Sequence, residues 1–209
     1  GPVSLASYGG IFYRNVRASG VTPQISVIMG PCAGGAVYSP AMTDFIFMVD
    51  DTSYMFITGP DVVKTVTGED VTQQELGGAA THSSKSGIAA FTAPDDKAVL
   101  DDVRFLLGFL PSNNMETAPE LDSGDPHDRS TPELVDLIPD SANVPYDMRK
   151  VIEVVADDNE FFEYFPRWAT NIVCGFIRLT CQRDAPISLD AAAYACVLDI
   201  EASEKAARF

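Results

Sequence analysis

Residues 29–36 (Met-Gly-Pro-Cys-Ala-Gly-Gly-Ala) have the types and order needed to bind an anion through the backbone. The β-branched run 24–29 predicts a buried strand before them, and a short helix is expected over 36–42. Small residues let a ligand approach the main chain, and the first N–H groups of a helix have no partner inside it. Such N–H groups stabilise an anion or an oxyanion. The alternative is a tight strand-to-helix connection that binds nothing.

Other kinds of chemistry fit this loop less well. It has neither the Lys and Ser/Thr of a P-loop nor the Gly-x-Gly-x-x-Gly spacing of a dinucleotide-binding turn. Cys32 would lie near a helix N-terminus, where thiols are activated. No histidine is near it in the sequence, however, and its Gly and Ala neighbours suit packing. Ser39 precedes Pro40 and fits no nucleophile-elbow pattern.

Two further titratable residues, His82 and Lys85, lie in the polar segment 81–87. His82 is either a base or, as we favour, a histidine hydrogen-bonded within the protein. Lys85 suits a phosphate group or solvent equally well. The acidic pairs at 50–51 and 157–158 are expected in solvated turns, because adjacent side chains rarely point the same way.

Cysteine and histidine spacing predicts no metal site in this chain. No cysteine pair has the short spacing of a zinc knuckle, and the two histidines complete no metal-binding group. Reduced, buried thiols are therefore expected. The residues concerned are Cys32, Cys174, Cys181, Cys196, His82 and His127.

Strands and helices that alternate along the chain must position the loop. Apolar runs predict strands at 24–29, 45–49, 54–58 and 172–179. Apolar periodicity, caps and helix-ending residues predict helices at 8–19, 36–42, 60–67, 95–110, 147–155 and 199–209. Thr72 and Glu75 have the spacing of a capping box. The six prolines of 111–145 predict an inter-domain connection at the surface.

Charge and composition exclude several classes of protein. The chain has 209 residues, of which 46% are hydrophobic, and a formal net charge of −16. Residues 1–110 contribute −5 of that charge and residues 111–209 contribute −11. An acidic balance of this size disfavours duplex DNA or an anionic membrane surface as the main partner. No apolar run approaches the length that spans a bilayer.

Several long stretches carry a family resemblance. They are residues 18–45, 56–69, 75–79 (Glu-Leu-Gly-Gly-Ala), 82–87, 110–114 (Leu-Pro-Ser-Asn-Asn) and 200–209 (Ile-Glu-Ala-Ser-Glu-Lys-Ala-Ala-Arg-Phe). In these stretches the sequence resembles the β (carboxyltransferase) subunit of biotin-dependent acyl-CoA carboxylases, with the propionyl-CoA carboxylase branch the most similar. The likeness covers about residues 3–180 and 197–209.

The resemblance implies an α/β fold of the crotonase-like type, in which ββα units wind into a superhelix. Residues 1–110 would be the later part of the N-terminal carboxyltransferase domain. Residues 111–140 would be a connection, and residues 141–209 would begin the C-terminal domain. Because the family's subunit is more than twice this length, the chain is expected to be an internal fragment.

The resemblance also implies a reaction. Carboxybiotin on a separate carrier breaks down to CO₂ and a biotin enolate, which removes the α-proton of an acyl-CoA. The thioester enolate then attacks CO₂. In the family the backbone N–H groups of a Gly-Gly pair form the oxyanion hole for the thioester, and here that pair is Gly34 and Gly35. The second hole, on the biotin side, belongs to a part of the family outside this chain.

Further expectations follow from the same resemblance. Cys32, Ala33 and Ala36 would line the acyl-CoA site, and Arg14 and Arg17 are candidates to face the CoA phosphates. The expected partners are an acyl-CoA, a biotin carboxylase with its biotin carrier, and further copies of the subunit in a dimer-built hexamer. No nucleic acid, membrane or bound metal is expected. A cytoplasmic location is favoured over the mitochondrial matrix.

One stretch, residues 181–196, departs from the family pattern. It has the family's length there, but it lacks the apolar strand and the Gly-rich loop. We therefore expect residues 181–196 to be disordered or misfolded.

Two other functions remain open. The chain could belong to the α subunit of a sodium-pumping decarboxylase, which transfers the carboxyl group from an acyl-CoA to biotin. It could also be a catalytically incompetent fragment that only folds, associates or binds CoA.

Overall fold

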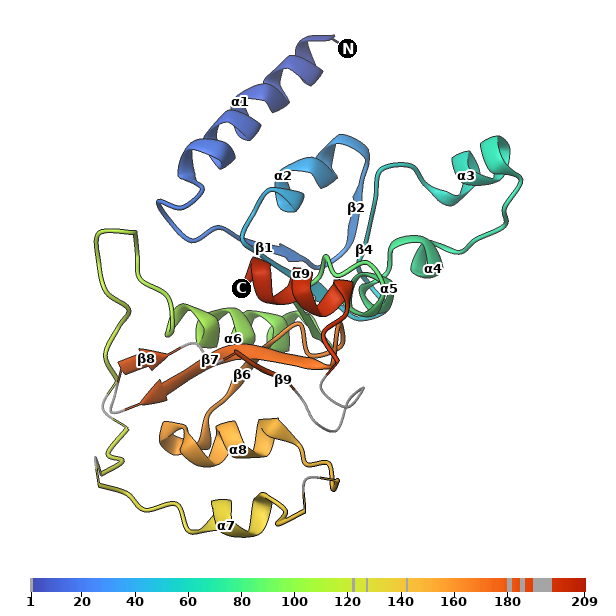
Figure 1. The fold of residues 1–209 in the computed structure, drawn as a ribbon. Helices are drawn as coiled ribbons and strands as arrows, with labels where there is room; N and C mark the ends of the chain where they lie inside the picture. Colours follow the sequence, from blue (N-terminus) through green and yellow to red (C-terminus); the bar gives the residue numbers. More distant parts are fainter. Residues whose placement is uncertain are drawn as a thin grey trace. The chain divides into compact units, whose positions relative to one another are not determined.

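The computed structural model describes residues 2–121, 123–126, 128–141, 143–179, 182–184, 187–189 and 197–209. It divides into two compact units, residues 1–117 and residues 118–209. Figure 1 labels the helices and strands of both units.

Unit 1 contains two small parallel sheets that the chain visits in alternation. The first sheet has the order β1 (Ile25–Ile28), β3 (Phe45–Val49), β5 (Phe91–Ala93). The second pairs β2 (Pro31–Ala33) with β4 (Tyr54–Phe56). Each of β1 and β3 is therefore followed by a short strand of the other sheet: β1 lies beside β3 in the first sheet, and β2 lies beside β4 in the second (Figure 1).

The helices of unit 1 connect and cover these strands. They are α1 (Pro2–Ala18), the 3₁₀ helix η1 (Gly34–Val37), α2 (Tyr38–Ala41), α3 (Pro60–Thr67), α4 (Gln73–Gly77), α5 (Ala79–Ser84) and α6 (Asp96–Leu107). Local signals fix several ends. Gly68, with φ of 78°, terminates α3, and Asp95 caps α6 through the Ala98 N–H. The predicted capping box of Thr72 and Glu75 is confirmed at α4.

The core of unit 1 centres on β3. Phe47 and Met48 are fully buried although they point to opposite faces of the sheet, so β3 is covered on both sides. Phe47 stacks on Phe91 of β5 with a ring-centroid distance of 4.5 Å. Val99 and Leu106 of α6 are also fully buried, as the apolar periodicity of that helix predicts, whereas Leu100 and Leu107, which share the periodicity, are exposed.

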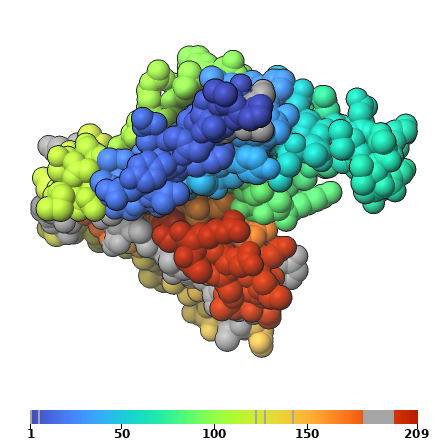
Figure 2. Space-filling model, turned by 90° about the horizontal axis from the view of Figure 1, so that it is seen from above, coloured from blue at the N-terminus to red at the C-terminus, as the bar shows by residue number. Residues whose placement is uncertain are grey.

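The first helix, α1, lies at the surface of unit 1 as the dark blue segment in Figure 2. Its outward side chains include Val3, Tyr13 and Val16, all more than half exposed. The ring of Phe12 meets the Tyr38 ring of α2 edge-on at 6.1 Å. One side of α1 therefore packs on the rest of unit 1, while the other side faces away from it.

Unit 2 is built around the long strand β7 (Ile172–Leu179), which lies between antiparallel partners. Its partners are β6 (Phe162–Tyr164), β8 (Gln182–Asp184) and β9 (Ile187–Leu189). The helices of unit 2 are α7 (Glu133–Leu137), α8 (Met148–Val155), η2 (Asp157–Asn159) and α9 (Ile200–Arg208). Val173 and Cys174 of β7 are fully buried.

Several elements differ from the sequence expectations. Residues 31–33 form a strand rather than part of a loop, and α1 begins six residues before the expected start at Tyr8. Helix α7 lies inside the proline-rich stretch, where no helix was expected. In the segment 181–196, residues 182–184 and 187–189 pair with β7 as strands, which differs from the expected disorder. The rest of that segment lies outside the described residues.

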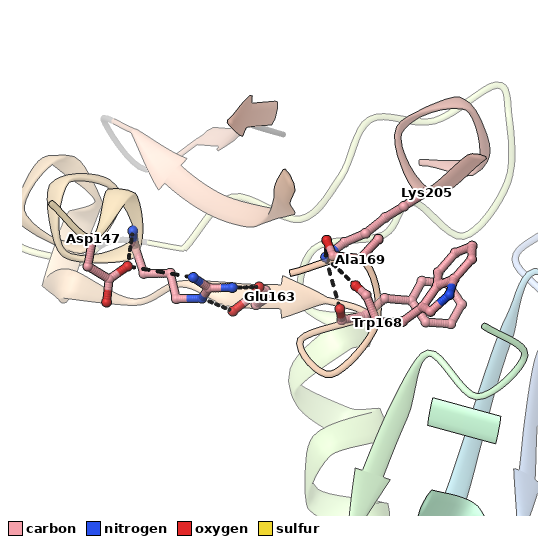
Figure 3. A network of polar contacts seen from close by, with 7 residues as sticks. Asp147, Glu163, Trp168, Ala169 and Lys205 are labelled. Atoms are coloured by element: carbon pink, nitrogen blue, oxygen red, sulfur yellow. Dashed lines mark hydrogen bonds and ion pairs between the residues drawn. The ribbon is translucent and has the colours of Figure 1, made fainter. Parts of the chain in front are cut away.

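A buried lysine organises the loop between β6 and β7 (Figure 3). The Lys205 ammonium of α9 donates to the carbonyls of Phe165, Trp168 and Ala169 at 2.9, 3.1 and 3.4 Å. Phe165 and Ala169 have φ of 53° and 46°, in the left-handed region that side chains disfavour. Lys205 thus holds three carbonyl groups of a strained loop in place. Burial lowers the pKa of Lys205 to about 8, opposed by nearby Glu163.

We predict that Lys205→Met destabilises the 209-residue chain by about 1–3 kcal/mol, because it leaves buried carbonyl groups without a donor. The measurement is the free energy of unfolding in urea. Lys97→Met is the control, since the Lys97–Asp101 ion pair is exposed to solvent and its loss should change stability little. Equal losses of stability for the two variants would contradict the structural role of Lys205.

Candidate functional site

The Gly-Gly turn follows directly from β2. Ala33 is extended, with φ of −134° and ψ of 153°, and Gly34 then takes φ of +64°. This left-handed conformation favours glycine and redirects the chain into η1 and α2. The turn that the sequence predicted is thus present, but it enters a 3₁₀ helix and one turn of α-helix rather than a helix beginning at Ala36.

Two groups border the turn. A Cβ built on Gly35 would lie 3.7 Å from the Tyr8 ring of α1, and one on Gly34 would lie 4.0 Å from the Ile57 carbonyl oxygen. Gly34 and Gly35 are the first two residues of η1, so their N–H groups have no acceptor within that helix. Two adjacent backbone donors in a half-buried turn are suited to hold an oxyanion.

Helix α1 is held against α2 and the start of β1 by a polar cluster of three residues, Asn15, Gln24 and Ser39. Asn15 Nδ2 donates to Gln24 Oε1 at 2.9 Å, and Gln24 Nε2 donates to the Asn15 carbonyl at 3.0 Å. The Ser39 hydroxyl of α2 donates to Asn15 Oδ1 at 2.9 Å. Ser39 is therefore engaged in holding α1 against α2, in agreement with its lack of a nucleophile-elbow pattern.

Strand β2, which leads into the turn, pairs with β4, and β4 in turn is contacted by His82. Cys32 pairs with Met55 in the parallel register of these strands. His82 lies on α5 and is buried, with its Nε2 2.7 Å from the Met55 carbonyl oxygen and its Nδ1 2.8 Å from Ser86 Oγ. Both ring nitrogens are thus used within the protein, as expected for a hydrogen-bonded histidine rather than a free base.

The Cys32 thiol has the properties of a packing group. Its Sγ lies 3.6 Å from the Ala36 carbonyl oxygen, to which it donates. Burial raises the pKa of the Cys32 thiol above its ordinary value, so the thiolate is disfavoured at neutral pH. This argues against a nucleophilic role. The neighbouring Ala33 and Ala36 are exposed beside the turn.

The three candidate cations are all exposed. Arg14 and Arg17 lie on α1, where Arg14 Nη1 donates to the Gly10 carbonyl at 3.0 Å. Lys85 follows the end of α5. The contact of Arg14 and Arg17 with CoA phosphates, and that of Lys85 with a phosphate group, stay predictions. Tyr8 and Asn15 were not predicted as neighbours of the turn, because their residue types indicate nothing beyond their positions in a helix.

Neither a metal-binding cluster nor a membrane-spanning helix is found among the residues that the structure describes. No group of three or more His, Cys, Asp or Glu residues there is arranged to hold a metal ion. No helix there has the length and apolar character needed to cross a membrane.

Comparisons with known proteins identify the family of this chain. The family model for the carboxyl transferase domain matches residues 1–209. The chain is 55% identical over 206 residues to the methylmalonyl-CoA decarboxylase α subunit of Veillonella parvula, and 54% identical over 206 residues to the propionyl-CoA carboxylase β chain of Roseobacter denitrificans. Each alignment covers 99% of this chain and 40% of the relative.

A solved structure shares the fold over the whole chain. It is the transcarboxylase 12S hexamer with methylmalonyl-CoA and methylmalonic acid bound, and it superposes with a TM-score of 0.95 at 45% identity, covering 100% of this chain and 40% of that one. The crotonase-like α/β fold expected from the sequence is thereby confirmed. The chain spans about 40% of the length of these relatives. On these grounds the chain belongs to the carboxyl transferase domain family.

Proposed function

We propose that this chain supplies the acyl-CoA half of a carboxyltransferase active site. The enzyme would transfer a carboxyl group from carboxybiotin to the α carbon of a short acyl-CoA, with propionyl-CoA favoured as the substrate. The family match over all 209 residues carries this proposal, because it includes the Gly34–Gly35 turn. Support comes from the 54% identity to a propionyl-CoA carboxylase β chain.

In this mechanism the protein stabilises the negative charge that develops on the substrate, and it does not supply a general base. Carboxybiotin, a substrate on its carrier, releases CO₂ and becomes the biotin enolate, which takes the α-proton of the thioester. The thioester oxygen then carries a negative charge, which the N–H groups of Gly34 and Gly35 stabilise until the α carbon bonds to CO₂. This division of labour agrees with His82, whose ring nitrogens are both occupied within the protein.

The walls of the acyl-CoA site follow from the same proposal. Cys32, Ala33 and Ala36 flank the turn and would contact the thioester end of the substrate. Arg14 and Arg17 would face the CoA phosphates from α1. Such local cations matter because the net charge of −16 is unfavourable for an anionic ligand.

The assembly and the partners are part of the proposal. Residues 1–110 would belong to the N-terminal domain and residues 141–209 to the C-terminal domain, joined by 111–140. The biotin-side oxyanion hole would come from the C-terminal domain of another copy, so that the site would form only in an oligomer. A hexamer is supported by the assembly of transcarboxylase 12S, and the carboxyl donor would be a biotin carrier.

The reverse transfer is a second candidate function. It is favoured by the 55% identity to a methylmalonyl-CoA decarboxylase α subunit, which is one percentage point above the 54% identity to a propionyl-CoA carboxylase β chain. The same turn would then stabilise the enolate as CO₂ leaves. The partners discriminate between the two functions: a biotin carboxylase subunit supports carboxylation, whereas a membrane-bound decarboxylase subunit supports the reverse.

We predict that a full-length carboxyltransferase subunit containing these residues catalyses exchange of an isotope-labelled carboxyl group between methylmalonyl-CoA and propionyl-CoA when free biotin is supplied. The chain alone should be inactive, because it lacks the biotin-side hole. Mass spectrometry of the CoA esters gives the measurement. An inactive full-length subunit would refute the proposed function, and an active isolated chain would refute its dependence on a second domain.

We further predict that Gly35→Pro lowers kcat of the full-length enzyme by about 10²–10³-fold, because proline removes one N–H from the oxyanion site. Steady-state kinetics with propionyl-CoA gives the measurement. Gly35→Ala is the matched control: it keeps the N–H, and its Cβ meets the Tyr8 ring at an ordinary contact distance of 3.7 Å. Normal turnover in Gly35→Pro, or an equal loss in Gly35→Ala, would contradict the role of this N–H.

A further inference from the structure

The hydrogen bonds of His82 define which nitrogen carries its proton. A carbonyl oxygen only accepts, so Nε2 donates to the Met55 carbonyl at 2.7 Å. Nδ1 then accepts from the Ser86 hydroxyl at 2.8 Å in the neutral ring. The imidazole is therefore a fixed bridge from α5 to the backbone of β4, with each nitrogen satisfied.

The Met55 carbonyl faces the edge of β4 that is remote from β2. The Tyr54 N–H donates to the Gly30 carbonyl at 3.4 Å, on the β2 side. Because successive residues of a strand direct their backbone groups to alternate sides, the Met55 carbonyl points the opposite way. Without a donor there, this edge of a two-stranded sheet would present an unpaired acceptor.

Two glycines let the α4–α5 junction reach this edge. A Cβ on Gly77 would overlap the Met55 carbonyl oxygen, so another residue at 77 would push the junction away. Gly78 forms an isolated bridge with Tyr54. The Gly77–Gly78 pair, which the proposed mechanism does not use, therefore brings His82 within hydrogen-bonding distance of β4.

Strand β4 in turn sets the position of the Gly-Gly turn. Met55 pairs with Cys32 and Phe56 pairs with Ala33, the residue directly before Gly34. The carbonyl of Ile57, just beyond β4, borders Gly34 itself. Two strands of three residues have little stability of their own, so the hydrogen bond from His82 at the centre of β4, together with the Gly78–Tyr54 bridge, helps to hold both strands in place.

We propose that His82 is a positioning residue for the oxyanion site that the proposed function assigns to Gly34 and Gly35. It acts through the backbone. The imidazole binds the Met55 carbonyl of β4, β4 pairs with β2, and β2 leads directly into Gly34 and Gly35, so that their N–H groups are placed for the substrate. This inference rests on the proposed function.

Two polar substitutions isolate the decisive contact. In His82→Gln the side-chain amide nitrogen occupies the place of Nε2 and still donates to Met55. In His82→Asn the amide reaches only the Nδ1 position, so the bond to Ser86 is replaced and the bond to Met55 is lost. In the holoenzyme we expect His82→Asn to lower kcat by about 10²-fold with little change in KM for propionyl-CoA. His82→Gln should restore most of that loss.

A second readout reports on the backbone itself. Hydrogen–deuterium exchange should be faster in the peptide covering 29–37 in His82→Asn and close to the parent in His82→Gln. Asp95→Ala is the control for a general loss of stability in unit 1, because it removes the cap of α6 without touching β2 or β4. Its kcat and its exchange in 29–37 should match the parent.

Distinct outcomes separate this inference from the proposed function. Equal kcat values for His82→Asn, His82→Gln and the parent would overturn the positioning role, as would an equal loss in both variants. If Gly35→Pro keeps normal turnover, the proposed function fails on its own account. Faster exchange over 29–37 in His82→Asn would still support the coupling of His82 to the turn, and unchanged exchange would refute it.

Discussion

The parallel pairing of β2 with β4 is the constraint on which the candidate site depends. Each of these strands has only three residues, yet their pairing sets the position of the backbone directly before Gly34. Their register is inherited from the larger sheet, because β1 leads into β2 as β3 leads into β4. The buried strand β3 thus affects the turn indirectly. Its fully buried residues Phe47 and Met48 fix β3 in the core, β1 pairs with β3, and β2 and β4 follow directly from these two strands.

Features of the fold with local causes could be predicted from the sequence. β3 was predicted with its bounds because its five consecutive apolar residues end at an acidic turn. The capping box of α4 and the bounds of α3 depend on residues within one or two helical turns. By contrast, β2 was predicted to be a loop, since Pro-Cys-Ala has no strand pattern and becomes a strand only by pairing with Tyr54–Phe56.

The site shows the same division between local and distant causes. The Gly34–Gly35 turn could be located because glycine itself reports an unusual backbone conformation, and Gly34 does have φ of +64°. The neighbours of the turn could not be located in this way. The Met55 carbonyl that His82 contacts is 27 residues away, and a backbone acceptor leaves no mark on residue type. Tyr8 likewise reaches Gly35 through the packing of α1, which depends on Asn15, Gln24 and Ser39.

The buried amine of Lys205 has a chemical consequence for a protein of this family. Thioesters acylate amines, and only the unprotonated amine is nucleophilic. With a pKa of about 8, Lys205 has a larger unprotonated fraction at neutral pH than an ordinary lysine, and it would be the more reactive amine if a thioester could reach it. Complete burial beneath three carbonyl groups prevents that approach. Burial therefore lowers the pKa of this amine and at the same time keeps a thioester from reaching it.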